Sequence, residues 1–422
     1  MNGTICALAT APGGALGIIR ISGPQALEIL SSIFTKDLTT ALPNTIHYGH
    51  ISDIDEVLVS VFRAPHSYTG EDSAEISCHG SRYILNKVLE LLTANGCRMA
   101  NPGEYTMRAY LNGKLDLSQA EAVADLIASS NQATHHLAMS QLRGGISTEL
   151  SLLREQLLKL TSLLELELDF SDHEDLEFAD RTELMTLANK IDKHITRLSQ
   201  SFELGQAIKQ GIPVAIVGKT NVGKSTLLNR LLHEDRAIVS DIHGTTRDTV
   251  EDTIDLQGVT FRFIDTAGIR HTDDQIELMG IDRSISAAQR AQIILMMTEP
   301  GVPYPDVPIR EDQTVIRIEN KTDAFQAKYG VGIDDLRQHL IDAAPKAADS
   351  DFIVTNARHY DALCRAHSHL QRVIEGLQNQ LSGDLLSEDL RLTLDTLAEI
   401  TGAQITPNEV LENIFKHFCV GK

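Results

Sequence analysis

The pattern of apolar positions changes along the 422-residue chain. Over residues 1–117, short apolar runs alternate with turns rich in Gly and Pro, which predicts a compact α+β domain. From Leu117 onwards, leucines recur at steps of three and four residues, which is the spacing of one buried helix stripe. The clearest stripes are Leu153, Leu157, Leu160, Leu164 and Leu168, and, near the C-terminus, Leu386, Leu390, Leu394 and Leu397.

A Gly-rich loop directly follows the apolar run at residues 214–217. Residues 218–225 read G-x-x-x-x-G-K-S, and the residues after them have the pattern of a helix. In such a loop, successive backbone N–H groups converge on a phosphate, while Lys224 would reach the β- and γ-phosphates. Ser225 would offer its hydroxyl to Mg²⁺. The strand, loop and helix in this order favour a phosphate site over an ordinary Gly-rich turn.

Two further motifs at strand ends indicate which nucleotide binds. The motif D-T-A-G occupies residues 265–268, and N-K-T-D occupies residues 320–323, each after an apolar strand pattern. Asp265 would hold Mg²⁺ through water, and the Gly268 N–H would sense the γ-phosphate. The Asp323 carboxylate can accept both N–H donors of the guanine edge, a pattern that adenine lacks. The sequence therefore favours GTP over ATP.

The sequence G-T-T-R-D at residues 244–248 lies where switch I is expected, between the first two motifs. Thr246 would close the Mg²⁺ shell when a γ-phosphate is present, so this loop would order with GTP. After the D-T-A-G motif, Ile269 takes the place of the glutamine that orients the attacking water in Ras-like enzymes. We interpret Arg247 and Arg270 as structural ion-pair partners. Another group must therefore stabilise the charge on the γ-phosphoryl.

The two leucine-rich segments flank the nucleotide motifs, which predicts one discontinuous helical domain with a nucleotide domain inserted into it. We expect an N-terminal domain at residues 1–117 and the inserted domain at residues 211–345. The helical domain would comprise residues 118–210 and 346–422.

The inserted domain is expected to be shortened on its guanine side. Four prolines between residues 298 and 312 disfavour the helix that normally precedes the N-K-x-D strand. After Asp323, only three residues lead to Ala327 and Lys328, which resemble the last base-contacting loop of such nucleotide domains, with Gln326 in place of the usual serine. The customary helix and strand do not fit in this interval. We therefore expect weaker nucleotide affinity than a complete domain would give.

The composition narrows the class of protein. A hydrophobic content of 42% is enough for packed cores. The sequence contains neither an apolar stretch of membrane-spanning length nor an N-terminal signal, so we expect a cytoplasmic protein without membrane contact. Its five cysteines lack C-x-x-C spacing, which predicts reduced thiols and no zinc site.

These motifs together resemble those of the tRNA-modification GTPase family MnmE, also called TrmE. The switch I sequence, the run D-T-A-G-I-R and the ending F-C-V-G-K at residues 418–422 look like that family, as do Y-T-G-E-D at residues 68–72 and N-P-G-E-Y at residues 101–105. The resemblance extends over nearly the whole chain. It implies a multidomain α/β and α protein with a folate-binding-like N-terminal α+β domain, a discontinuous helical domain and an inserted Ras-like P-loop G domain.

The resemblance also supplies the missing catalytic group. In this family, K⁺ replaces an arginine finger when two G domains meet face to face. By position, Asn221 would bind K⁺ together with Ser240, Ile242 and Thr245, and Glu277 would position the water indirectly. Mg²⁺ would be held by Ser225 and Thr246, and we assign catalytic roles to Lys224, Thr246, Glu277 and Cys419.

The residues expected to contact GTP come from the phosphate loop, switch I and the two strand-end motifs. They are Asn221, Val222, Gly223, Lys224, Ser225, Thr226, Ser240, Asp241, Ile242, His243, Gly244, Thr245, Thr246, Asp265, Thr266, Ala267, Gly268, Asn320, Lys321 and Asp323.

The family modifies carbon 5 of the wobble uridine of certain tRNAs. Its N-terminal domain resembles folate-binding one-carbon enzymes, so the resemblance implies 5-formyl- or 5,10-methylene-tetrahydrofolate as a cofactor. Arg20, Glu75, Lys114 and Lys422 match its folate contacts, although from the residues alone each could be a surface ion pair. Cys419 could be a nucleophile in the modification or an inert tail thiol.

The partners implied by the resemblance are a second copy of the chain, the flavin-dependent protein MnmG (GidA) in a heterotetramer, and tRNA. The net charge of −21 gives little electrostatic attraction for RNA, so we expect the partner to hold most of the tRNA. The alternative function is a regulatory GTP-binding switch in ribosome or RNA maturation. Such a switch would carry RNA-binding modules rich in Lys and Arg, whereas the flanks here are acidic.

Overall fold

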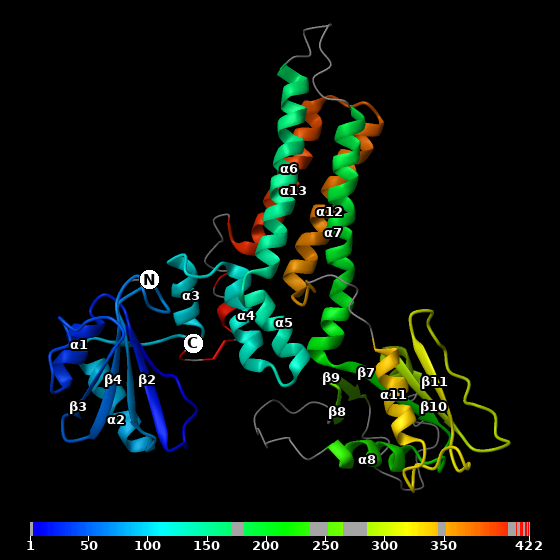
Figure 1. The fold of residues 1–422 in the computed structure, drawn as a ribbon, viewed down its shortest axis with the longest axis horizontal. Helices are drawn as coiled ribbons and strands as arrows, with labels where there is room; N and C mark the ends of the chain where they lie inside the picture. The colour runs from blue at the N-terminus through cyan, green and yellow to red at the C-terminus, as the bar shows by residue number, and fades with distance from the viewer. Residues whose placement is uncertain are drawn as a thin grey trace. The chain divides into compact units, whose positions relative to one another are not determined.

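The chain divides into two compact units, which are described separately below. Figure 1 labels the helices and strands of both. One unit comprises Met1–Ala128, Ala138–Ile195 and Asp361–Lys422, and the other comprises Ser129–Leu137 and Thr196–Tyr360. The structure, a computed structural model, describes residues 3–169, 181–235, 252–264, 285–344, 352–403, 411, 414–416, 418–419 and 421, with side chains omitted for residues 166–169 and 233–235.

The first unit begins with a six-stranded sheet. Strands β1 and β6 pair in parallel, and the other neighbouring strands are antiparallel. In spatial order the strands are β3 (Thr45–Ile51), β4 (Asp55–Phe62), β5 (Ser73–His79), β2 (Leu16–Ser22), β1 (Ile5–Leu8) and β6 (Arg98–Met99).

Helices α1 (Ala26–Ile33) and α2 (Arg82–Ala94) contribute to the core on one face of this sheet. Ile19 and Ile21 of β2 and Ile76 of β5 are fully buried in that core. Side chains alternate between the two faces of a strand, so the residues next to these isoleucines along β2 and β5 project from the opposite face. This alternation directs Arg20 and Glu75 away from the helices.

The helical part of this unit contains a bundle in which α6, α7, α12 and α13 run side by side (Figure 1). His194 of α7 lies 2.7 Å from Glu149 of α6, and His367 of α12 lies 2.8 Å from Asp192 of α7. The helices are α3 (Glu104–Leu111), α4 (Leu117–Ala128), α5 (Gln132–Leu142), α6 (Gly145–Asp169), α7 (Arg181–Gln210), α12 (Ala357–Gln378) and α13 (Gly383–Thr401), and parts of α5, α7 and α12 belong to the second unit.

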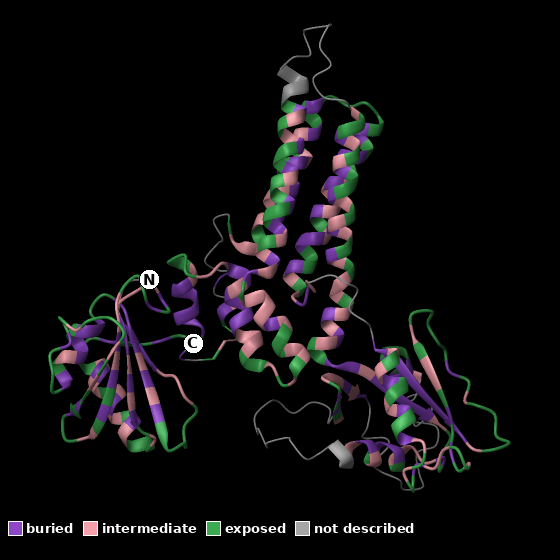
Figure 2. Cartoon of the chain, viewed as in Figure 1, coloured by how far each residue is buried: buried purple, intermediate pink, exposed green. Residues whose placement is uncertain are grey.

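The buried faces of these helices follow the leucine stripes in part (Figure 2). In α6 the four leucines at positions 153, 157, 160 and 164 are fully buried, as predicted, whereas the Leu168 side chain lies outside the described residues. In α13 the stripe is wrong at one position, because Leu394 is only half-buried and Thr393 takes its place in the core. Thr393 satisfies its hydroxyl by donating to the Asp389 carbonyl at 2.8 Å, so the buried helix face can accept it.

The second unit contains a five-stranded sheet that is parallel except for its edge strand β8, which pairs antiparallel with β9. In spatial order the strands are β11 (Thr314–Glu319), β10 (Ile293–Thr298), β7 (Ile212–Gly218), β9 (Val259–Phe263) and β8 (Asp252–Leu256).

Both faces of this sheet are buried. Val214 and Ile216 of β7 pack in the same core as helices α8 (Lys224–Asp235) and α11 (Ile333–Ala343), and Ala215 and Val217 pack in a second core with the helical residues 285–290. The continuous apolar run in β7 reflects this burial on two sides. Since β7 lies between β9 and β10, the loop at its carboxyl end is at the position where ligands bind in open parallel sheets.

The segments before and after β11 contain little regular structure, as predicted. The described residues between β10 and β11 contain no helix, as the prolines predicted. After β11 the next helix is α11, which begins at Ile333, and the intervening residues form only an isolated bridge between Gln326 and Val331. The interval between β11 and α11 is therefore a compact turn. This agrees with the prediction that it is too short for a helix and a strand.

All five cysteines are free thiols, in agreement with their spacing. Cys6, Cys78 and Cys97 are buried in the first unit, and Cys419 is exposed. Across the ranges that the structure describes, no helix combines the length and apolarity needed to span a bilayer.

The leucine stripe of α6 allows a matched test of core packing. Leu157 is fully buried and its neighbour Leu158 is 39% exposed. Leu157→Ala should lower the free energy of unfolding by about 2–5 kcal/mol, because it leaves a cavity between helices, whereas Leu158→Ala should cost less than about 1 kcal/mol. Urea denaturation followed by circular dichroism measures both, and equal losses would contradict the assigned helix face.

Candidate functional site

Two positions of the predicted phosphate loop require glycine because neighbouring groups leave no room for a side chain. A Cβ on Gly218 would lie 2.7 Å from the Met297 carbonyl oxygen, and a Cβ on Gly223 would lie 2.5 Å from the Asn320 amide nitrogen. Gly223 also has a φ of 101°, which L side chains rarely adopt. The loop backbone therefore comes close to two neighbouring strand ends, and only glycine permits this approach.

Lys224 lies at the start of α8, where the loop ends. Its Nζ donates to the carbonyl oxygens of Gly218 at 2.6 Å and Lys219 at 2.7 Å. Burial lowers the pKa of this ammonium group from its ordinary value. The two carbonyls hold the charged end of Lys224 at the loop whose N–H groups would converge on a phosphate.

Asn320 connects the predicted phosphate loop to the turn that follows the N-K-T-D motif. Its side chain is almost fully buried, at 5% exposure. Its Nδ2 donates to the Val222 carbonyl at 2.8 Å, and its Oδ1 accepts from the Ala327 N–H at 3.1 Å. One amide thus joins three segments that the sequence predicted to contact nucleotide.

The rest of the N-K-T-D motif forms a short turn after β11. The Thr322 hydroxyl accepts the Phe325 N–H at 3.1 Å, and Thr322 N–H donates to the Phe325 carbonyl at 3.1 Å. Asp323 is exposed at this turn, as a carboxylate that receives a ligand must be. Lys321 pairs with Glu299, which follows β10 directly. Sequence reasoning missed Glu299, because the two residues are brought together only by the pairing of β10 with β11.

The turn that replaces the missing helix and strand is closed by its own hydrogen bonds. The Gln326 carbonyl accepts the N–H groups of Tyr329 and Gly330, each at 3.0 Å, and Gln326 N–H donates to Val331 at 3.1 Å. The Lys328 ammonium lies 5.5 Å from the centre of the Tyr329 ring. These contacts bring Ala327 back to Asn320 despite the short connection.

Several predicted residues lie outside the described residues. They are the switch I residues Ser240, Asp241, Ile242, His243, Gly244, Thr245 and Thr246, the motif Asp265, Thr266, Ala267 and Gly268, and also Glu277 and Lys422.

A second cluster of predicted residues lies on the face of the N-terminal sheet opposite α1 and α2. Arg20 and Glu75 are register partners on β2 and β5, and the Arg20 Nη2 lies 2.6 Å from the Glu75 carboxylate. Arg20 Nη1 also donates to the Gly421 carbonyl at 2.9 Å. The structure therefore brings Arg20, Glu75 and the C-terminal segment together.

Two tyrosines that the sequence did not single out flank this ion pair. The Arg20 guanidinium lies 5.7 Å from the centre of the Tyr68 ring and 5.5 Å from that of Tyr105. The Tyr105 hydroxyl donates to the Arg20 carbonyl at 2.8 Å, and burial raises the pKa of Tyr68. Lys114 is exposed and donates to the Pro65 carbonyl at 3.1 Å, in the loop that leads to Tyr68. Both tyrosines occur in the motifs quoted above for the family resemblance, but their proximity to Arg20 depends on the fold.

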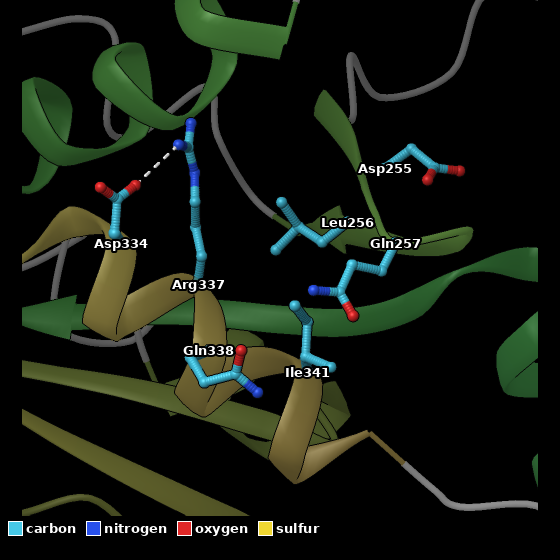
Figure 3. Close-up of a pocket in the computed structure, with 7 residues that line it drawn as sticks. All are labelled: Asp255, Leu256, Gln257, Asp334, Arg337, Gln338 and Ile341. Carbon is cyan, nitrogen blue, oxygen red and sulfur yellow. Dashed lines mark hydrogen bonds and ion pairs between the residues drawn. The ribbon is translucent and has the colours of Figure 1, made fainter.

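The second unit also contains a hollow of about 280 Å³ between the β8–β9 turn and α11 (Figure 3). Arg337 lies beside it and pairs with Asp334 at 3.2 Å. The residues that line the hollow are Asp255, Leu256, Gln257, Asp334, Arg337, Gln338 and Ile341. None of these residues belongs to the nucleotide motifs, and we assign no ligand to this hollow.

Two family models together match nearly the whole chain. The model described as the MnmE helical domain matches residues 117–419, and the model described as the GTP-binding protein TrmE N-terminus matches residues 4–114.

Similar proteins match over nearly their full lengths. The tRNA modification GTPases MnmE of Phocaeicola vulgatus and Bacteroides fragilis are each 53% identical to the chain, with 99% of both sequences covered. That of Christiangramia forsetii is 47% identical, with 100% of both covered. The alignment with the Bacteroides fragilis protein spans 463 positions, whereas this chain has 422 residues, so the relative has residues at dozens of positions that are missing here. The chain belongs to the MnmE family of tRNA modification GTPases.

Proposed function

We propose that this chain hydrolyses GTP and acts in tRNA modification, the activity named for its relatives. The observation that carries the proposal is the bridging amide of Asn320, which joins the Val222 carbonyl of the phosphate loop to the Ala327 N–H. Phosphate and base recognition would thus be parts of one site. Lys224 would neutralise phosphate charge, and Asp323 would accept the guanine N–H donors.

The inserted G domain would occupy residues 211–345, between helical segments at residues 118–210 and 346–422, after an N-terminal domain at residues 1–117. Two observations support this division. The nucleotide motifs flank strands of one five-stranded sheet, and the family model of the helical domain runs across them from residue 117 to residue 419.

The phosphate loop fits a nucleotide with its metal ions. Side chains at Gly218 and Gly223 would fill the space beside the loop backbone, so the cradle depends on glycine. Ser225, in the first turn of α8, would hold Mg²⁺ with Thr246. Asn221 is exposed on the loop with a φ of 64°, and it would hold K⁺ with Ser240, Ile242 and Thr245. When bound, K⁺ would supply positive charge to the γ-phosphoryl, while Glu277 would act on the water through other groups.

The Arg20–Glu75 cluster fits a tetrahydrofolate derivative. Its carboxylate can accept the amidine-like donor edge of a pterin, and its aromatic neighbours Tyr68 and Tyr105 offer flat surfaces. Lys114 and Lys422 would attract the glutamyl carboxylates. When bound, the folate would supply the one-carbon unit for carbon 5 of the wobble uridine. Cys419 would be a nucleophile in that chemistry.

The remaining partners follow from the same proposal. A homodimer would pair two G domains, and the flavin-dependent MnmG (GidA) subunit would join it in a heterotetramer. With a net charge of −21, the chain would depend on that subunit for most of its contact with tRNA. The assembly would act in the cytoplasm.

The guanine assignment can be tested through Asp323. Asp323→Asn should weaken GTP binding at least about a hundredfold, because the amide cannot accept both guanine donors. It should strengthen binding of xanthosine triphosphate, whose carbonyl accepts from the new amide. Calorimetric titration measures both affinities. In a strain lacking the gene, mass spectrometry of tRNA should show modified wobble uridine with the parent chain and not with Asp323→Asn.

Asp334→Asn is the matched control, because the Asp334 side chain is 96% exposed on α11. It should leave the affinity for GTP and the tRNA modification unchanged. If Asp323→Asn bound GTP as tightly as the parent, guanine would not be read by Asp323. If the parent chain failed to restore modification, the proposed function would be wrong.

The potassium assignment can be tested through Asn221. At equal ionic strength, the parent should hydrolyse GTP at least about tenfold faster in KCl than in NaCl, because the cation stands where other enzymes use an arginine. Asn221→Ala should bring this ratio close to one. Asn189→Ala, which removes a surface amide on α7, should leave the ratio unchanged. Equal parental rates in the two salts would remove the potassium mechanism.

A further inference from the structure

The C-terminal segment packs into the first unit. Phe415 is 1% exposed in an apolar cluster with Met107 of α3 and Leu117 of α4, and its ring centre lies 5.1 Å from that of Phe418. A segment near the end of the chain therefore has its own hydrophobic anchor. Beyond this anchor, Gly421 is buried and its carbonyl contacts Arg20.

Gly103 receives this segment at the start of α3. Its N–H donates to the Cys419 carbonyl at 3.3 Å. A Cβ at this position would lie 2.8 Å from the Phe415 carbonyl oxygen and 2.9 Å from the Phe418 Cβ. Since backbone atoms cannot move away without displacing the segment, any side chain at Gly103 would push it off the turn.

The turn itself is held by a buried carboxylate. Glu104 is fully buried and accepts from Arg98 at 2.5 Å, from Arg108 at 3.0 Å and from the Asn101 N–H at 2.9 Å. Burial alone would raise the pKa of Glu104, but these hydrogen bonds lower it to about 2. The carboxylate is therefore ionised at neutral pH, and it gives the turn a fixed position against which the C-terminal segment can pack.

The last described residue of the segment, Gly421, contacts the Arg20 side chain. Gly421 has a φ of 95°, and a Cβ there would lie 2.4 Å from the Leu8 carbonyl oxygen. Its own carbonyl accepts from Arg20 Nη1 at 2.9 Å, while the same guanidinium pairs with Glu75. The position of the chain end thus helps to fix the orientation of Arg20.

We propose that Gly103 is a positioning residue: it seats the C-terminal segment so that the Gly421 carbonyl is held against the guanidinium of the Arg20–Glu75 pair, completing one wall of that site. The part of this inference that concerns folate rests on the proposed function. The seating of the segment does not.

The chain offers a matched pair of glycines for the test. Gly103 and Gly113 lie at opposite ends of α3 with φ values of 67° and 68°, but no atom lies within 4 Å of a Cβ on Gly113. Both substitutions to Ala impose the same backbone strain, so a difference between them reports the contact with the C-terminal segment. Hydrogen–deuterium exchange with mass spectrometry, on the full chain, measures the protection of that segment.

Gly103→Ala should speed exchange in peptides covering residues 411–422 by about tenfold or more, while Gly113→Ala leaves it close to the parent. Gly103→Ala should also weaken binding of 5-formyltetrahydrofolate about tenfold, the effect of losing one charge-assisted contact to Arg20. Exchange in β4 checks that the sheet remains folded. If Gly103→Ala does not fold, Phe418→Ala should loosen the segment from its other side with the same two effects.

If Gly103→Ala left the exchange rate of residues 411–422 unchanged, the proposal would be overturned. Faster exchange with unchanged affinity for 5-formyltetrahydrofolate would overturn the link to Arg20. If the parent bound no 5-formyltetrahydrofolate, the folate part of the proposed function would fail, and the exchange data would still decide whether Gly103 seats the segment.

Discussion

The proposed nucleotide site depends on the buried amide of Asn320. A buried amide that lacks a partner costs about 1–3 kcal/mol for each unsatisfied group, so both ends of this side chain must be bonded. Its partners are the Val222 carbonyl in the phosphate loop and the Ala327 N–H in the turn after the N-K-T-D motif. Gly223 must be glycine because the same amide occupies the space that a Cβ would need. The two halves of the site are therefore fixed together.

This constraint explains how the second unit can lack a helix and a strand and keep its site. The turn at residues 320–332 has to return Ala327 to Asn320, and the bridge between Gln326 and Val331 achieves this over a few residues. The sequence predicts that Ala327 and Lys328 contact the base after this short connection, and that the affinity for nucleotide is weakened. The observed hydrogen bond shows that the short connection still reaches Asn320, while the prediction about affinity stays open.

Much of the fold could be predicted from the sequence because the signals are local. The run at residues 214–217 and the glycines after it specify a buried strand and a phosphate loop, and the leucines of α6 mark its buried face. The stripe in α13 was harder, since a threonine that bonds its own backbone can replace a leucine in a core. The family resemblance identifies Arg20 and Glu75 separately as candidate site residues. It does not predict that they pair, because the pairing depends on the register of β2 and β5.

Contacts between distant segments were beyond sequence reasoning for the same reason. Glu299 meets Lys321 only because β10 and β11 are neighbours, and Gly103 meets Cys419 across most of the length of the chain. In each contact, the local sequence around one residue does not indicate its distant partner. The packing of the whole unit gives such residues their role.

The most direct test of the shared nucleotide site is calorimetric titration of Asn320→Ala with GDP and with inorganic tripolyphosphate, which lacks a base. Asn379→Ala, at an exposed position after α12, serves as the control. If Asn320 joins the two halves, its loss should weaken both ligands at least about tenfold, because the loop loses its support at Val222 as well as the base-side turn. Unchanged affinity for tripolyphosphate, with only GDP weakened, would contradict the account.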